Sequence, residues 1–112
     1  MNERDEKGIK NIIKHIVQIN HYVSTINSLE EFGDSSLVVD AVIFNLLQIG
    51  EIVRNKVSLQ IKEENLTIPW RKIYGLRNRL IHDYDNILMD IVYETIIEDL
   101  PKLLIDLRDL LK

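Results

Sequence analysis

The sequence predicts an all-α protein, a small antiparallel helical bundle that forms a single domain over residues 1–112. Three observations indicate this fold class. Apolar residues recur at spacings of three and four along most of the chain, which is the period of an amphipathic helix. No segment alternates apolar and polar residues as a half-buried strand does, and no internal repeat is present. A length of 112 residues suits one domain with one core.

The first predicted helix carries an apolar seam in which spacings of three and four alternate, and we expect it to end near Ser28. Gly33 with Asp34 predicts a turn. Asp34, Ser35 or Ser36 can then cap the next helix. The seam consists of Ile9, Ile12, Ile16, Ile19, Val23 and Ile26.

The second long helix is predicted over 36–56 and is apolar nearly all round. Its apolar residues fall on opposite faces, so that no single stripe accounts for them. Such a helix must be buried on several sides. In a domain of few helices one of these sides can belong to a second copy, so we expect a two-fold dimer. The apolar residues are Leu37, Val38, Ala41, Val42, Ile43, Phe44, Leu46, Leu47, Ile49, Ile52 and Val53.

The second half of the chain continues the helical pattern. Residues 58–67 are mixed and polar, and we expect a short helix or a loop there. Pro69 fits the first turn of a helix, which predicts a helix over about 70–83. A last helical stretch is predicted over 88–111, where Pro101 should kink the helix while the apolar seam keeps its phase.

The composition excludes several classes of protein. Cysteine is absent, so there is neither a disulfide framework nor a thiolate metal site. The longest unbroken apolar run, 41–44, is far shorter than a membrane span. The first residues are charged and no apolar segment of an export signal follows them. We therefore expect a cytoplasmic protein with no membrane partner.

The net charge of −4 argues mildly against indiscriminate nucleic-acid binding, but the charges are unevenly distributed. Residues 54–79 contain seven Lys and Arg against two Glu, whereas residues 83–112 contain eight acidic residues against three basic ones. A locally basic stretch on an acidic protein can contact phosphates without coating the whole molecule in them. A solvated helix face with a random charge pattern explains the same counts equally well.

The segment 77–84 combines a permanent cation, an amide, an imidazole and a phenol within two helical turns. RNA cleavage by its own 2′-hydroxyl needs one group that moves protons near neutral pH, and His82 suits this role. It also needs a group that stabilises charge on the phosphate, which Arg77 or Arg79 could supply. Asn78 is a candidate positioning donor. In the alternative interpretation the segment has no catalytic role, and His82 and Tyr84 only pack against other residues.

Helix geometry constrains this segment. Arg77 and His82 are five residues apart and therefore differ by roughly 140° around an ideal helix, so they do not share a face. Asn78 and His82, four apart, do share one. Either Arg77 reaches around, or the helix ends near His82, or a second subunit completes the site. Arg79 can instead pair with Asp83 at four-residue spacing.

Other polar and aromatic residues leave two interpretations each. Glu51 lies beside Gly50 in an apolar helix, where an unpaired buried glutamate is rare. It can face the site as a supporting residue or bind Arg77, or it can be simply exposed. Trp70 and Tyr74 are four apart and could stack nucleobases, although core packing is the better explanation.

No residue pattern supports a metal or a cofactor. His15 and His21 are six apart and lie on different faces of a helix, which makes a poor metal pair. Asp83, Asp85 and Asp90 could hold a hard cation, but a helix-end turn explains them more simply. We therefore expect neither a metal nor a cofactor.

The pattern Arg, four residues, His, one residue, Tyr is present as Arg77, His82 and Tyr84, with Asn78 directly after the arginine. Together with its surroundings it resembles the HepT-like toxin family of the HEPN superfamily, and the resemblance covers nearly the whole chain. One small departure is Leu76, where many relatives carry Met. The supporting surroundings are Ile68-Pro69-Trp70, Gly75, Gly50-Glu51 and Asp99-Leu100-Pro101.

The resemblance implies a metal-independent endoribonuclease toxin of a type VII toxin–antitoxin pair, active as a homodimer with two motif segments facing across a cleft. Arg77 and His82 would be catalytic, and Asn78 and Arg79 would position the RNA. The implied antitoxin is a minimal nucleotidyltransferase that silences the toxin by adenylylating Tyr84. The alternative function is a non-catalytic helical dimer that serves as substrate or scaffold for such a nucleotidyltransferase.

Overall fold

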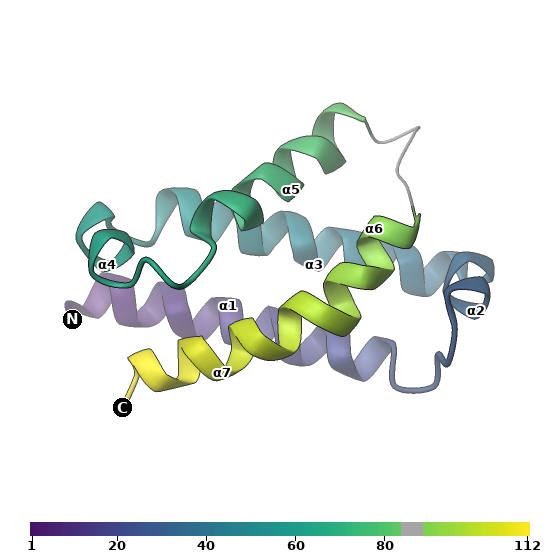
Figure 1. The fold of residues 1–112 in the computed structure, drawn as a ribbon, viewed down its shortest axis with the longest axis horizontal. Coiled ribbons are helices and arrows are strands. Elements are labelled where there is room, and N and C mark those ends of the chain that lie inside the picture. The colour runs from purple at the N-terminus through teal and green to yellow at the C-terminus, as the bar shows by residue number, and fades with distance from the viewer. Residues whose placement is uncertain (84–88) are drawn as a thin grey trace.

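The computed structural model describes residues 1–83 and 89–112, and all regular structure within these residues is helical. The prediction of an all-α fold is therefore confirmed. Figure 1 shows the arrangement. The elements are α1 (Glu3–Tyr22), α2 (Leu29–Asp34), α3 (Ser36–Asn55), α4 (Leu59–Glu64), α5 (Trp70–His82), α6 (Met89–Glu94), a π-helical turn η2 (Thr95–Asp99) and α7 (Leu100–Leu110).

Helix α3 is the centre of the bundle. It runs antiparallel to α1, lies between α1 and α5, and contacts both extensively, while α7 packs along α1 (Figure 1). The predicted apolar seam of α1 lies in the core, where Ile9, Ile12, Ile16 and Ile19 are fully buried. The core therefore lies around α1 and α3, and it leaves α5 on the outside of α3.

The exterior of α3 is only partly covered. Its length and composition would allow it to cross a membrane, but a buried core helix has the same properties, and this one packs between α1 and α5. The expectation that it is buried on several sides holds for the faces toward α1 and α5. Leu37 and Phe44 nevertheless remain 85% and 58% exposed. Two large apolar side chains of the central helix thus face outward in the single chain.

The first helix ends earlier than predicted, at Tyr22 rather than near Ser28. The segment expected to hold a turn at Gly33 is instead the short helix α2. Ser28 caps α2, since its hydroxyl accepts the Glu31 N–H at 3.1 Å, and Phe32 is fully buried beneath it. The helical spacing of apolar residues therefore continues to Ile26, although α1 ends at Tyr22.

The last helical stretch continues past Pro101, and its seam stays buried on both sides of the proline, as expected. The unforeseen feature is the π turn just before it, in which the Leu100 N–H donates to the carbonyl of Thr95 five residues back. Proline cannot donate a backbone hydrogen bond, and its ring conflicts with the carbonyl four residues before it. A wider turn accommodates this conflict and fits the successive four-residue spacings of Val92, Ile96 and Leu100.

A buried carboxylate links the first turn of α1 to the residue that precedes α4. Asp5 is only 3% exposed, and its oxygens accept the Ser58 N–H at 2.7 Å and the Ser58 hydroxyl at 2.8 Å. Burial lowers the pKa of the neighbouring Lys62, and Asp5 opposes this shift through its negative charge. Asp5 thereby anchors the start of α4 to the first turn of α1.

Candidate active site

Arg77 of α5 lies directly against Gly50 of α3. A Cβ atom at Gly50 would lie 2.3 Å from Cβ of Arg77 and 2.6 Å from its Cγ, far inside van der Waals contact. Only glycine therefore lets the stem of Arg77 lie directly against the backbone of α3. This close approach fixes the position of the Cβ and Cγ atoms from which the guanidinium of Arg77 extends.

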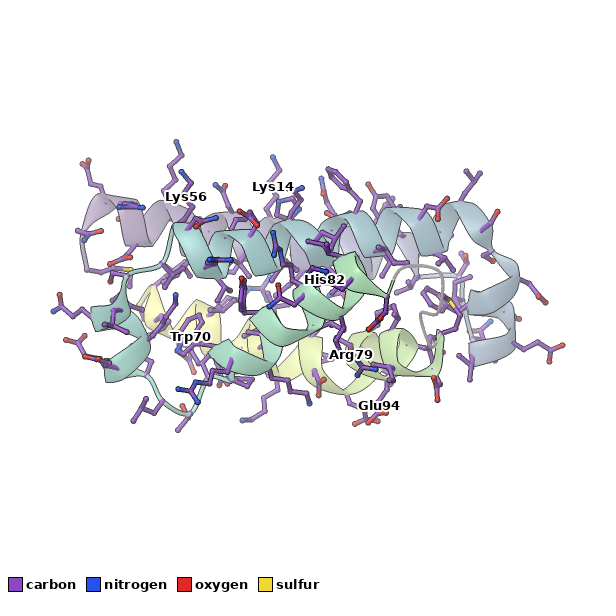
Figure 2. All side chains as sticks on the ribbon, turned by 90° about the horizontal axis from the view of Figure 1, so that it is seen from above. Lys14, Lys56, Trp70, Arg79, His82 and Glu94 are labelled. Atoms are coloured by element: carbon purple, nitrogen blue, oxygen red, sulfur yellow. The ribbon has the colours of Figure 1, made fainter. Side chains whose placement is uncertain are left out.

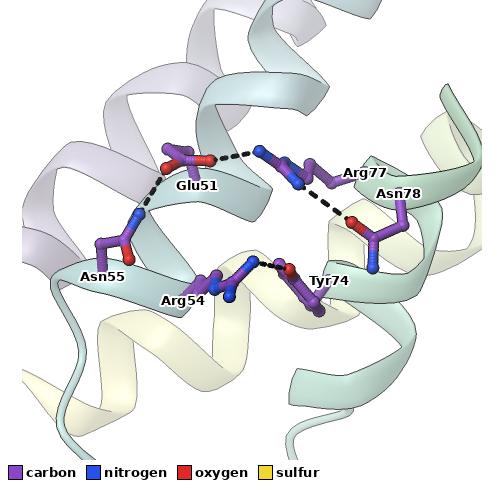
Figure 3. A network of polar contacts seen from close by, with 6 residues as sticks. All are labelled: Glu51, Arg54, Asn55, Tyr74, Arg77 and Asn78. Atoms are coloured by element: carbon purple, nitrogen blue, oxygen red, sulfur yellow. Dashed lines mark hydrogen bonds and ion pairs between the residues drawn. The ribbon is translucent and has the colours of Figure 1, made fainter. Parts of the chain in front are cut away.

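The guanidinium of Arg77 is held by two side chains (Figure 3). Its Nη2 donates to Oε2 of Glu51 at 2.8 Å, and its Nη1 donates to Oδ1 of Asn78 at 3.0 Å. Asn55 donates to the other oxygen of Glu51. The side chain of Arg77 is 20% exposed and that of Glu51 is 45% exposed, so solvent reaches the pair. Of the alternatives for Glu51, binding to Arg77 is the one that the structure shows.

A second polar contact crosses the same helix interface (Figure 3). Arg54 of α3 donates a hydrogen bond to the hydroxyl of Tyr74 on α5. The guanidinium carbon of Arg54 lies 5.1 Å from the centre of the Tyr74 ring, and that of Arg77 lies 5.7 Å from it. Two cations thus contact one aromatic ring, in the range of cation–π attraction.

Arg54 was not among the site residues predicted from the sequence, and Tyr74 was expected to pack in the core. The available signal was spacing: Arg54 follows Glu51 by three residues, and Tyr74 precedes Arg77 by three. Residues three apart lie on the same face of a helix. Once Glu51 and Arg77 are paired, Arg54 and Tyr74 become neighbours in the next turn of antiparallel helices.

His82 is the last residue of α5 and is exposed (Figure 2). Helix α5 therefore ends at His82, one of the geometries that the spacing left open. Arg77 points instead onto α3, and no hydrogen bond within residues 1–83 and 89–112 joins it to His82. Within one chain Arg77 is therefore hydrogen-bonded to Asn78 and Glu51 but not to His82.

Arg79 lies apart from the Arg77 cluster. It is exposed and lines a mainly apolar cavity of about 430 Å³ between α3, α5 and the helices that follow. No ion pair with Asp83 is formed among the described residues; the Asp83 N–H donates to the backbone carbonyl of Arg79 at 2.9 Å. The predicted role of Arg79 in positioning RNA stays a prediction, and the structure places it on another face.

Several other expectations can be compared with the structure. Trp70 is 7% exposed and its indole N–H donates to the Asn65 carbonyl at 3.1 Å, which confirms core packing. Nδ1 of His15 lies 2.7 Å from Oδ1 of buried Asn45, and no group of three potential metal-binding side chains occurs in the described part of the chain. The predicted regulatory residue Tyr84, with Asp85, lies outside the described residues.

Comparison with known proteins identifies the family. The chain matches the HepT-like family, described as Ribonuclease HepT-like, over residues 12–110. The protein belongs to this family. The match extends from α1 to the end of α7, so it includes Glu51, Arg77 and His82. The resemblance stated from the motif and its surroundings is confirmed.

Individual relatives of this HepT-like protein carry names that agree with the family. It is 32% identical over 85 residues to "Putative RNase TTE0752" of Caldanaerobacter subterraneus subsp. tengcongensis, covering 76% of this chain and 75% of the relative. It is 31% identical over 104 residues to "Putative RNase MJ1380" of Methanocaldococcus jannaschii, covering 92% and 94%. It is 36% identical over 63 residues to "Probable ribonuclease HepT" of Thermococcus cleftensis, covering 56% of each chain. No solved structure gives a significant match.

Proposed function

We propose that this HepT-like protein is a metal-independent endoribonuclease, the cytoplasmic toxin of a type VII toxin–antitoxin pair. The observation that carries the proposal is the placement of Arg77. Gly50 lets its stem lie against α3, and Glu51 and Asn78 hold its guanidinium at a solvent-accessible position. This preorganised cation occurs in a chain that matches a ribonuclease family.

The proposed reaction uses only groups of the RNA and the protein. The 2′-hydroxyl oxygen of a ribose attacks the adjacent phosphorus, and the bond from phosphorus to the 5′-oxygen of the next nucleotide breaks. The products are a 2′,3′-cyclic phosphate and a free 5′-hydroxyl. His82 takes the proton from the 2′-hydroxyl or supplies one to the leaving oxygen. Arg77 stabilises the negative charge that builds on the non-bridging oxygens, with Asn78 orienting its guanidinium.

A second copy of the chain would complete the site. Within one chain Arg77 and His82 are not joined, and α3 leaves Phe44 exposed while α5 leaves Ile81 45% exposed. These apolar side chains come from the two helices that carry the candidate site. We infer that they pack in a two-fold homodimer, in which the two motif segments face each other across the RNA.

The antitoxin in this proposal is a minimal nucleotidyltransferase that modifies Tyr84. The phenol oxygen attacks the α-phosphorus of ATP, pyrophosphate leaves, and the phenol loses its proton. Tyr84 follows His82 by two residues, so the added nucleotide would bring bulk and negative charge beside the proposed RNA phosphate position. Cleavage would then be blocked without unfolding the toxin.

The alternative is a non-catalytic dimer that serves as substrate or scaffold for the nucleotidyltransferase. The lack of a hydrogen bond between Arg77 and His82 in the single chain and the net charge of −4 favour it. Cleavage of RNA by the purified protein, compared with His82→Ala, separates the two functions. Equal and negligible cleavage by both proteins would favour the scaffold.

A further inference from the structure

We propose that Arg54, held in place by Tyr74, binds the RNA phosphate next to the one that is cleaved. The inference rests on the proposed ribonuclease function and adds a second substrate position to the same site. Arg54 would contact the phosphate directly, and Tyr74 would act as a positioning residue. Neither is part of the motif Arg77–His82–Tyr84.

The geometry consists of two adjacent contacts between α3 and α5. Glu51 with Arg77 forms the first and Arg54 with Tyr74 forms the second (Figure 3). Both steps along the helices are three residues, which corresponds to a rise of about 4.5 Å. The two guanidiniums also contact the same Tyr74 ring, at 5.1 and 5.7 Å from its centre. An extended RNA backbone that reaches Arg77 therefore passes within reach of Arg54.

The two arginines differ in how their charge is compensated. Arg77 is paired with Glu51, and the other oxygen of Glu51 accepts from Asn55. Both oxygens of the carboxylate are therefore engaged. Arg54 contacts the neutral phenol of Tyr74, and it forms no ion pair with any residue in the described ranges. The net positive charge of this four-residue cluster, Glu51, Arg54, Tyr74 and Arg77, is thus carried at Arg54, which is exposed.

The arrangement suits a phosphate better than a nucleobase. A guanidinium has five N–H donors, and the contact with Tyr74 uses one of them, which leaves a face for bidentate binding to phosphate oxygens. The Tyr74 ring is half-buried and already contacts two cations, so it does not offer a free face for stacking. Arg54 would therefore bind RNA without reading its sequence.

The test measures the salt dependence of RNA binding, with every variant made in the cleavage-impaired His82→Ala background. Fluorescence anisotropy of a short labelled single-stranded RNA is followed between about 50 and 200 mM salt. Losing one phosphate contact reduces the slope of log K against log salt by about 0.7 for a single strand. We expect this reduction for Arg54→Gln and a restored slope for Arg54→Lys.

Two further variants separate a local contact from a general charge effect. Arg108→Gln makes the same change in net charge at an exposed position in the last turn of α7, and it should leave the slope unchanged. Tyr74→Phe removes the hydroxyl that holds Arg54 but keeps the ring and the cation. It should weaken binding several-fold while the slope stays near that of the parent.

The possible failures are distinguishable. If the parent binds no RNA even at low salt, the proposed ribonuclease function fails and this inference fails with it. If the parent binds RNA but Arg54→Gln keeps the full slope, only the inference fails. The same conclusion follows if Arg108→Gln reduces the slope as much as Arg54→Gln does. Circular dichroism of each variant verifies the fold, and if Arg54→Gln fails to fold, Arg54→Met, which also removes the cation, takes its place with the same expected reduction in slope. A Tyr74→Phe variant that binds RNA as tightly as the parent overturns the positioning role of Tyr74.

Discussion

The two glycines Gly50 and Gly75 should respond in opposite directions to the same substitution. Both lie inside helices, where alanine is intrinsically more favourable than glycine by about 0.5–1 kcal/mol. At Gly75 nothing lies within 4 Å of the added Cβ, so Gly75→Ala should realise this gain. The expected rise in Tm is roughly 2–8 °C for a domain of this size.

At Gly50 the same methyl group would lie 2.3 Å from Cβ of Arg77. Rotation of the Arg77 side chain cannot move its Cβ, so α5 must shift away from α3. Overpacking of this kind typically costs about 1–3 kcal/mol. After subtraction of the helix-propensity gain, the middle of both ranges gives a destabilisation of Gly50→Ala by about 1 kcal/mol, and the upper limit is about 2.5 kcal/mol. RNA cleavage should also fall because the guanidinium moves with α5.

Urea denaturation followed by circular dichroism measures these changes through the midpoint at constant m-value. The double variant Gly50→Ala/Arg77→Gly removes the conflicting atoms and should lose less stability than the sum of the two single variants. Gly50→Ala with the midpoint and cleavage rate of the parent would refute the close approach of α3 and α5. So would a Gly50→Ala that behaves like Gly75→Ala.

Three further substitutions test the buried carboxylate, the proposed dimer and the proposed regulatory tyrosine. Asp5→Ala should lower the free energy of unfolding by about 1–3 kcal/mol in urea denaturation, because the partly buried N–H and hydroxyl of Ser58 lose their acceptor. An unchanged midpoint would contradict this role. Phe44→Glu should convert a dimer to a monomer in light scattering, whereas Leu66→Glu, at an even more exposed apolar side chain, should not. A parent protein that is already monomeric at micromolar concentration would refute the dimer. Tyr84→Phe should keep most RNA cleavage but gain no adenylate mass after incubation with ATP, magnesium and the nucleotidyltransferase; equal modification of wild type and variant would exclude Tyr84 as the acceptor.

The fold was largely predictable because each long helix buries apolar residues that recur every three or four positions. The positions of α1, α3, α5 and the last helical stretch follow from that period, and the burial of Ile9 to Ile19 confirms it. The end of α1 was not predictable in the same way. Spacing continues to Ile26, but tertiary packing of Phe32 and the cap at Ser28 begin a new helix. The π turn depends on the steric conflict between the ring of Pro101 and the preceding turn of the helix. The spacing of apolar residues indicates this turn only weakly.

The candidate site was predictable only where its residues are close in sequence. The motif identified Arg77 and its neighbour Asn78. For Glu51, binding to Arg77 was one of the interpretations that the sequence left open. Arg54 and Tyr74 depend on the register between two helices, which no single-helix pattern specifies. Arg79 was assigned to the same site as Arg77, yet residues two apart point to different faces of a helix.

A single cleavage assay tests whether Arg77 and His82 cleave RNA without a metal. Purified protein is incubated with single-stranded RNA in the presence of EDTA, beside His82→Ala and Arg77→Ala. Loss of a general acid–base group typically costs 10²–10⁴-fold, so each variant should cleave at least about 100-fold more slowly than the parent. The products should carry 2′,3′-cyclic phosphate ends. Cleavage that disappears in EDTA and returns with magnesium, or that survives both substitutions, would contradict the account.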